Sequence, residues 1–378
     1  MKIKHLLIIG LGIMVSCNKA PLSRSKASFI QLPSPELGEE WSATQESQAE
    51  AILSITKDII TKRASEDRLY SRDAHPKAHG CVKAVLDIQS DKLPSSQRVG
   101  VFAENKKFDS WVRFSNGDPD SRHKPDSDVD VRGMALKIMN VSGASSGSQD
   151  MLMITSKEFF SKDGDDYLEL FNALTKSKAN LAWYALTHPL SAKRLFSARV
   201  QIANPLEANY FSSVPYKLGN RSMRFKSEPC ESGKDSLPQN PGKNYLQEKL
   251  VSSLSQKSYC FKISVQPNME PEKNPVEDPR QIWDEKKSPY YQVATLTIPP
   301  QSEINSKKMM NFCENLSMDP WHTHPQARPL GQINRMRALI YGEISKVRHD
   351  LNRTKVMEPT NLTPCQGQSA PLCDDPHH

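Results

Sequence analysis

The sequence predicts an α+β fold in which helices pack around a closed antiparallel β-barrel. The first observation is the order of elements: a helix, a β meander, helices, a pair of strands and a final helix, which is typical of such a barrel. The second is composition: 37% of the 378 residues are hydrophobic and 25% are charged. That is enough to bury a core and too polar for a polytopic membrane protein. After residue 20 no apolar run reaches about 18 residues, so we expect no later transmembrane helix.

The N-terminal residues predict export. Lys2 and Lys4 precede an apolar run from Leu6 to Val15, which has the length of the hydrophobic region of a signal peptide. Val15 and Ser16 then precede Cys17, which resembles a bacterial lipobox, where cleavage before the cysteine is followed by lipidation. We therefore expect a signal peptide over 1–16 and a lipid on Cys17. Secretion without a lipid and a plain apolar helix are the alternatives.

The residues after the cysteine predict a tether in the cell envelope. Asn18, rather than Asp, follows Cys17, which favours the outer over the inner membrane of a bacterium, with the protein facing the periplasm. Residues 17–45 are rich in Ser, Pro, Lys and Glu and read as a flexible tether. The lipid would be the contact with the membrane.

The cysteines are consistent with an oxidising compartment. Seven cysteines minus the lipidated one leave six, an even number. Cys365 and Cys373 are candidates for a disulfide that staples the C-terminal tail. Cys81 lies in the middle of a predicted strand, where a buried thiol is as good an interpretation as a disulfide.

The elements follow from hydrophobic periodicity and turn residues. Helical spacing predicts helices over 47–64, 163–175, 178–197 and about 331–352. Four short β-rich runs lie between residues 80 and 155, and two more at 257–267 and 291–299. Pro-rich segments at 229–243 and 267–279 read as loops.

The charge of the chain does not indicate a nucleic-acid partner. Fifty basic and 43 acidic residues give a formal net charge of +7, spread along the sequence. Nucleic-acid binding would require a basic stripe interleaved with aromatic residues. The aromatic and basic run at 206–225 is better explained by packing than by base stacking.

The last predicted helix carries the first candidate site residues. Arg337 and Tyr341 are four residues apart and share a helix face, and Arg348 returns close to that face seven residues later. A nearby cation favours an ionised phenolate, which is a ligand for ferric iron. The alternative is an aromatic core residue with two solvent-facing arginines.

Strand entrances carry the remaining candidates. His75 lies in a turn with Arg72 before the first strand, and Arg113 and Ser115 share one face of the next strand. The run from Asp150 ends in the aromatic pair Phe159 and Phe160.

Several motifs then occur in a fixed order. They are R-x-x-H-x-K-x-x-G at 72–80, V-R-F-S at 112–115, D-x-R-G-x-A-x-K at 130–137, the run 150–160, E-x-L-x-x-D-P at 314–320 and R-x-x-x-Y at 337–341. In this order they resemble the haem catalase superfamily over about residues 60–355. R-P-L-G-x-I-N-R at 328–335 is similar to the short catalase-like haem proteins. The long wrapping regions of classical catalases are absent.

This resemblance implies a catalase-like barrel, with helices outside it, that holds ferric haem b. It implies a haem domain over 46–355, followed by a C-terminal tail over 356–378. Tyr341 would ligate the iron, and Arg337 would keep it as phenolate. The remaining implied roles are propionate binding by Arg72, Arg113 and Arg348, a cofactor contact by Phe160, distal acid–base catalysis by His75 and a hydrogen bond from Ser115 to that histidine.

One departure from the family pattern concerns the distal pocket. Catalases have an Asn where this sequence has Thr155, which offers one hydroxyl in place of an amide. The resemblance therefore implies a haem peroxidase or weak catalase that acts on hydrogen peroxide or organic hydroperoxides, with an unidentified reductant. The alternative is a lipoprotein that binds, traffics or senses haem without turnover. The oligomeric state stays open, with a homo-oligomer among the alternatives.

Overall fold

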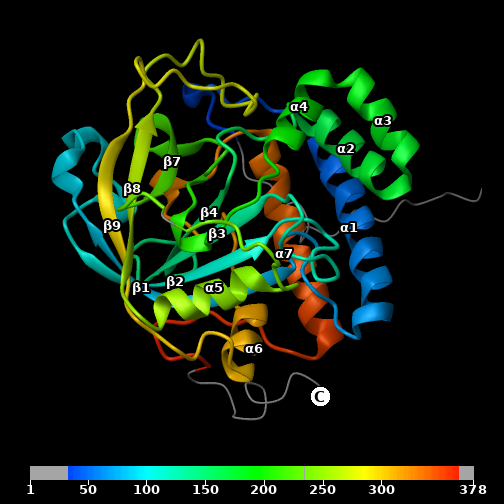
Figure 1. Cartoon of the computed structure of the whole chain (residues 1–378). Coiled ribbons are helices and arrows are strands. Elements are labelled where there is room, and N and C mark those ends of the chain that lie inside the picture. Colours follow the sequence, from blue (N-terminus) through cyan, green and yellow to red (C-terminus); the bar gives the residue numbers. More distant parts are fainter. Residues whose placement is uncertain (1–32, 234, 366–378) are drawn as a thin grey trace, which may run out of the picture.

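The computed structural model describes residues 33–233 and 235–365, and within them the strands close into a barrel (Figure 1). Nine antiparallel strands follow the order β5-β4-β3-β2-β1-β9-β8-β7-β6, and a further pairing of β5 with β7 closes the ring. The α+β fold with a catalase-like barrel is therefore confirmed. The strands are β1 (Lys77–Ile88), β2 (Lys107–Asn116), β3 (Arg132–Met139), β4 (Ser148–Ile154), β5 (Tyr210–Phe211), β6 (Tyr216–Leu218), β7 (Arg221–Pro229), β8 (Tyr259–Pro267) and β9 (Tyr291–Ile298).

Apolar side chains fill the barrel. Val82 of β1 lies opposite Val112 of β2, and Phe114, two residues further along β2, is fully buried beside Tyr210 and Phe261. Successive residues of a strand point to opposite faces. The faces of β1 and β2 that do not fill the barrel are thus free to carry polar groups. Tyr210 and Phe225 are 1% and 2% exposed, so the aromatic run at 206–225 is part of this core.

The helices cover the outside of the barrel. Figure 1 shows α1 and α7 side by side on one flank, with α5 and α6 below the sheet. Between α1 and α7 lies a second apolar core that includes Ile52, Leu53, Leu339 and Ile344. The helices are α1 (Gln45–Asp67), α2 (Gly164–Lys176), α3 (Lys178–Thr187), α4 (Pro189–Ser197), α5 (Tyr245–Leu254), α6 (Lys307–Asn315) and α7 (Gln332–Asn352).

The predicted helix over 178–197 is in fact two helices. Helix α3 ends at Thr187 and α4 begins at Pro189, with His188 between them in a non-helical conformation. The residue before a proline is driven out of the helical region by the proline ring, and proline itself is suited to the first position of a new helix. The prediction of a continuous helix was therefore wrong at this point.

Two disulfides have both cysteines among the described residues, and each joins segments that are distant in the sequence. Cys81 of β1 is bonded to Cys313 of α6, and Cys230 is bonded to Cys260. Interpreting Cys81 as a buried thiol was therefore wrong, because α6 packs on the outer face of β1 and brings a cysteine against it. The predicted partner of Cys365, Cys373, lies outside the described residues.

The described end of the predicted tether contacts the folded domain through Glu39. Glu39 is 2% exposed, and its carboxylate receives Arg335 Nη1 and Arg328 Nη2, both at 2.6 Å. Its Oε1 also accepts the backbone N–H of Gly331 at 2.8 Å. A carboxylate buried between two guanidinium groups holds its segment firmly. Composition could not indicate this contact, because the partners lie nearly 300 residues further along the chain.

The predicted C-terminal tail is also packed over its described part. Met357 is buried, Glu358 Oε2 lies 3.0 Å from the buried Lys137 Nζ, and the Asn361 carbonyl accepts Trp111 Nε1 at 3.1 Å. This part of the chain therefore supplies partners to buried donors on β2 and β3.

Nothing in the described residues tests the export signals. The proposed signal peptide and Cys17 lie outside the described residues. Among the described helices, none has the length and apolar character needed to cross a membrane.

Candidate functional site

Helix α7 places a cation directly against a phenol. Arg337 Nη2 donates a hydrogen bond to Tyr341 Oη over 2.9 Å, and the guanidinium carbon lies 5.0 Å from the centre of the tyrosine ring. The other guanidinium nitrogen, Nη1, donates to Asn334 Oδ1, which fixes the orientation of the group. Burial alone would lower the pKa of Arg337, but Tyr341, Tyr216 and Tyr167 raise it overall. Arg337 therefore stays charged and presents a fixed cation to Tyr341 Oη.

His75 lies in the turn that leads into β1. Its backbone has a φ of 58°, in the left-handed region, and is held by two hydrogen bonds: its N–H to the Gly117 carbonyl and its carbonyl from Arg113 Nη2. Its Nδ1 lies 3.2 Å from Ser115 Oγ. A Cβ at Gly133 would lie 2.5 Å from this nitrogen, so only glycine leaves room for the ring against β3. Gly133 of the D-x-R-G motif therefore leaves the space that the imidazole occupies.

The environment keeps the imidazole of His75 neutral. Desolvation, followed by repulsion from Arg113, Arg337 and Arg72, lowers its pKa to about 3. A neutral imidazole can accept a proton at one nitrogen while the other is held by Ser115. His75 is therefore available as a base at any physiological pH.

One cavity brings these groups together. Its walls contain six of the residues singled out from the sequence, namely Arg72, His75, Arg113, Ser115, Arg337 and Tyr341. Its volume is about 100 Å³, and a neighbouring cavity of about 450 Å³ shares Arg72, Met318 and Tyr341 with it. Arg348 lines the second cavity.

Arg72, Arg113 and Arg348 line these two cavities, and the carboxylate of Glu314 lies behind them. Arg348 Nη1 lies 2.7 Å from Glu314 Oε1, and Arg72 Nη2 donates to the Glu314 carbonyl at 3.0 Å. Burial would raise the pKa of Glu314, but Arg348, Arg72 and Arg113 lower it overall. Burial and the other arginines lower the pKa of Arg113 to about 9. Sequence analysis placed Glu314 only in a motif and did not predict that it pairs with Arg348. The available indication was a single Glu in the segment shortly before α7.

The cluster retains unused hydrogen-bonding capacity for an anion. Arg72 Nε and Arg113 Nε are buried and have no partner among the described residues. The carboxylates of Glu314 and Asp73 offset only part of the charge of three guanidinium groups, so a further anion would be stabilised here. Together with the Tyr341 phenol and a neutral imidazole on the walls of the same cavity, these residues fit an iron porphyrin with two carboxylate groups.

Two predicted site residues lie elsewhere. Thr155 does not line the cavity: its Oγ1 accepts the N–H of Arg132 at 3.1 Å and donates to the Ala198 carbonyl at 3.4 Å. Phe160 does not line the cavity: it packs against the barrel core and against Leu181, Tyr184 and Leu195, whereas its stacked neighbour Phe159 lines the cavity. Both Thr155 and Phe160 follow the end of β4 at Ile154, where strand alternation no longer sets the direction of a side chain.

The cavity has few other polar donors. Ser212 and Ser213 line it, but their hydroxyls donate to the backbone carbonyls of Val214 and Ser156, respectively. Most of the remaining wall is apolar, and sequence analysis did not predict which residues form it. They are Gly133, Met134, Ala135, Leu152, Met153, Ile154 and Met318.

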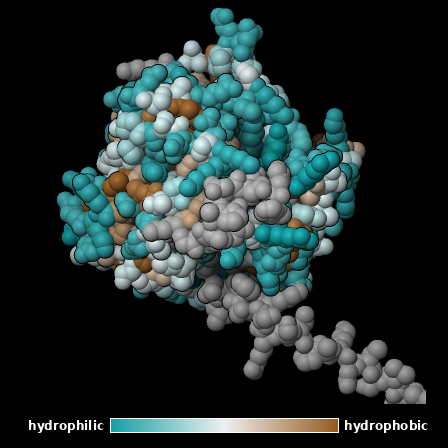
Figure 2. All heavy atoms as spheres, turned by 90° about the horizontal axis from the view of Figure 1, so that it is seen from below, coloured by the Kyte–Doolittle hydropathy of each residue, from teal (hydrophilic) through white to brown (hydrophobic). Residues whose placement is uncertain are grey.

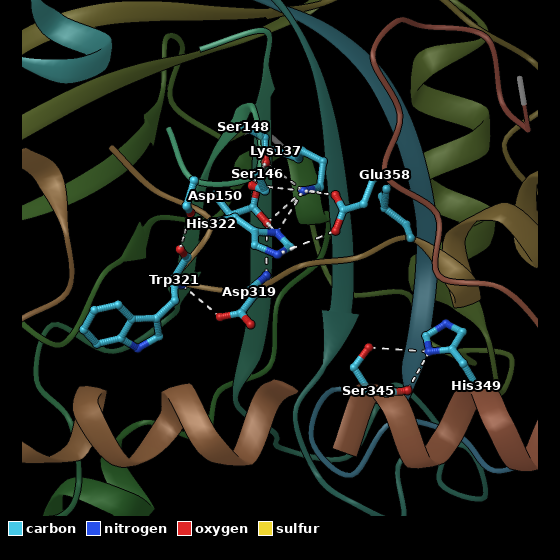
Figure 3. A network of polar contacts seen from close by, with 12 residues as sticks. Lys137, Ser146, Ser148, Asp150, Asp319, Trp321, His322, Ser345, His349 and Glu358 are labelled. Carbon is cyan, nitrogen blue, oxygen red and sulfur yellow. Dashed lines mark hydrogen bonds and ion pairs between the residues drawn. The ribbon is translucent and has the colours of Figure 1, made fainter. Parts of the chain in front are cut away.

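Next to Tyr341, a buried ion cluster positions the segment before α7 (Figure 3). Lys137 Nζ is 3.0 Å from both carboxylate oxygens of Asp150, and His322 Nδ1 is 3.2 Å from Asp150 Oδ2. Asp150 Oδ2 also accepts the N–H of Asp319, whose pKa burial raises to about 6. Two catalase-like motif residues, Lys137 and Asp150, are therefore structural. Among the described residues, no group of three or more His, Cys, Asp and Glu side chains could hold a metal ion.

Solved structures share this fold. A fungal catalase matches with a TM-score of 0.61 and 17% identity, over 83% of this chain and 69% of that chain. Catalase A from Saccharomyces cerevisiae matches with 0.61 and 16%, over 84% and 72%. A bacterial catalase matches with 0.60 and 17%, over 84% and 69%. No family model and no curated protein matches the sequence. The similarity therefore establishes a catalase-like fold.

Proposed function

We propose that this chain binds a b-type haem between His75 and Tyr341 and acts on peroxides. The observation that supports it is the arrangement of a neutral His75 and an Arg337–Tyr341 pair on the walls of one cavity. Phenolate ligation of ferric haem is the chemistry for which this pair is suited. Arg72, Arg113 and Arg348 would hold the propionates through charge-assisted hydrogen bonds.

When bound, the haem supplies the redox chemistry that cleaves a peroxide O–O bond. The protein's own contribution is proton transfer. Neutral His75 would take a proton from one peroxide oxygen and return it to the other, while Ser115 keeps the imidazole oriented. Tyr341 would hold the iron, and Arg337 would hold the Tyr341 oxygen through its hydrogen bond.

Peroxidase activity is favoured over efficient catalase activity. His75 is the main proton donor and acceptor facing the cavity, because the hydroxyls of Thr155, Ser212 and Ser213 are directed to backbone carbonyls. Losing one donor that acts in the transition state costs about 10²–10³ in rate. The apolar wall around Met153 and Leu152 would also accept the carbon chain of an organic hydroperoxide.

A second candidate function is haem binding without turnover. The small number of proton donors on the His75 side of the cavity favours this function, because a carrier or sensor needs only Tyr341 and the arginines. We further propose that the chain acts as a lipoprotein facing the periplasm and uses an external reductant. For its oligomeric state, a homo-oligomer is one of the alternatives we propose.

The test is haem titration of the purified full chain, followed by peroxide assays at equal haem content. We expect a Soret band of high-spin ferric phenolate type, and oxidation of a dye by hydrogen peroxide or cumene hydroperoxide that His75→Ala abolishes. Bound haem with equal, background-level oxidation in both proteins would support the carrier function. Absence of any haem binding would overturn both proposals.

A further inference from the structure

Helices α2, α3 and α4 form a helical lobe at one corner of the molecule, on the side of α1 away from the barrel (Figure 1). Helix α3 has its apolar side facing outward. Among its residues only Tyr184 is buried, whereas Trp183 is 67% and Leu186 75% exposed. A helix on the surface of a globular protein normally buries its apolar face. We therefore expect a binding partner to cover the exposed apolar side chains of α3.

The neighbouring helices also expose large apolar side chains. Leu190 and Phe196 of α4 and Leu174 of α2 are 40%, 52% and 51% exposed. By contrast, the face of the molecule seen from below is mostly hydrophilic, with scattered apolar residues (Figure 2). Soluble monomers seldom gather large apolar side chains on one surface unless it binds something.

Lysines border the exposed side of α3 and α4. From residue 176 to residue 199 the sequence contains five basic residues and no acidic one, and the exposed acidic residues of the lobe, Asp165 and Glu169, lie on α2. Three of them, Lys176, Lys178 and Lys193, are exposed. No ion pair is recorded for these three lysines in the part of the chain that the structure describes. Their positive charge is therefore available to a partner.

We propose that the helical lobe docks on an anionic phospholipid surface. Outward Trp, Leu and Phe side chains combined with exposed lysines are what a helix at a bilayer interface requires: the apolar groups enter the headgroup region and the lysines contact lipid phosphates. The three lysines decide between occupants, because a second copy of the 176–199 segment, which has no acidic residue, would bring like charges together. The proposal does not depend on haem binding or on a lipid at Cys17.

The test measures contact of Trp183 itself with lipid. The full chain is mixed with vesicles of phosphatidylcholine and phosphatidylglycerol whose acyl chains carry bromine, which quenches nearby tryptophan emission. We expect quenching that Trp183→Phe removes and that Trp41→Phe, the matched change at another exposed tryptophan (45% exposed), preserves. Equal quenching in wild type and Trp183→Phe, or no quenching in wild type, overturns the proposal.

A second arm tests the charges. Each lysine near an anionic surface contributes about fivefold in affinity, so changing Lys176, Lys178 and Lys193 together to Gln should lower vesicle affinity on the order of 100-fold. The change should have little effect with phosphatidylcholine alone. Unchanged affinity for the anionic vesicles contradicts the proposal. All three positions are exposed, so an unaltered melting temperature shows that the variant is folded.

A third arm tests a second copy as the occupant. Sedimentation velocity without vesicles should give the same species for wild type and Leu186→Ser. A dimer that Leu186→Ser dissociates would assign the surface to self-association and overturn the lipid proposal.

Discussion

Arg337 donates a hydrogen bond to Tyr341 from one turn earlier on the same helix, with 2.9 Å between Nη2 and Oη. The pair is held from both sides, since Asn334 orients the guanidinium group and is itself anchored to the Pro215 and Leu330 carbonyls. A cation fixed by helix geometry needs no rearrangement to stabilise a phenolate. This relationship governs the first prediction.

Tyr341→Phe should abolish stable haem binding while the fold persists, because it removes the oxygen that would ligate the iron. Arg337→Leu should weaken binding by roughly 10–100-fold, the usual cost of losing a group that supports a ligand. Titration of each variant with ferric haem, followed by its Soret band, measures both effects.

The matched control for that experiment is Tyr216→Phe. Tyr216 is also close to Arg337, but its buried hydroxyl has no partner among the described residues, so its removal should cost little. A Tyr216→Phe variant that loses haem as fully as Tyr341→Phe would mean that Tyr341 is not the ligand.

Thr155→Asn should leave any catalase rate nearly unchanged. The Thr155 side chain projects toward Ala198, and an Asn on the same Cα would follow that direction. If Thr155 instead faced the distal pocket, as the resemblance to catalases implies, an amide here would raise the rate. Oxygen evolution from peroxide at equal haem content decides between them; a rise of tenfold or more would place this side chain in the distal pocket.

Glu314→Gln should destabilise the protein by on the order of 3 kcal/mol, because it leaves Arg348 buried without its counter-ion. Urea unfolding of the haem-free protein at pH 7 measures the change. Glu50→Gln, at an exposed position of α1, is the control and should stay within about 0.5 kcal/mol of wild type. Similar losses in the two variants would show that the arginine cluster does not depend on Glu314.

Stability should fall as the pH is lowered from about 6.5 to 4, through His79. Desolvation lowers the pKa of this buried imidazole to about 4, whereas in the unfolded chain it titrates near its ordinary 6.5. Between these values only the unfolded state binds the proton, so acid favours unfolding, by up to about 3 kcal/mol for this group. His75, whose pKa is lowered further, acts in the same direction.

Comparison of unfolding free energies at pH 7 and pH 4.5 measures this effect. His79→Gln, which can keep the hydrogen bond to Asn116, should show a smaller loss between the two pH values than wild type does. His123→Gln, at a largely exposed surface position, should show the wild-type loss. An identical pH dependence in all three proteins would contradict the role given to His79.

The sequence by itself determined the local features of this protein. Alternation and helical spacing placed the strands of the meander, α1 and α7 because each pattern reports which face of an element is buried. The Arg337–Tyr341 pair was also predictable, since residues four apart on a helix are neighbours whatever surrounds them.

Only the tertiary structure decided which distant groups meet. The burial of Glu39 between Arg328 and Arg335 and the Cys81–Cys313 disulfide both depend on packing between segments far apart in the chain. The direction of Thr155 was likewise undetermined, because a shift of one residue after β4 turns a side chain from the cavity to the outside. Local pattern fixes the faces of an element, but the partner on each face is set by long-range packing.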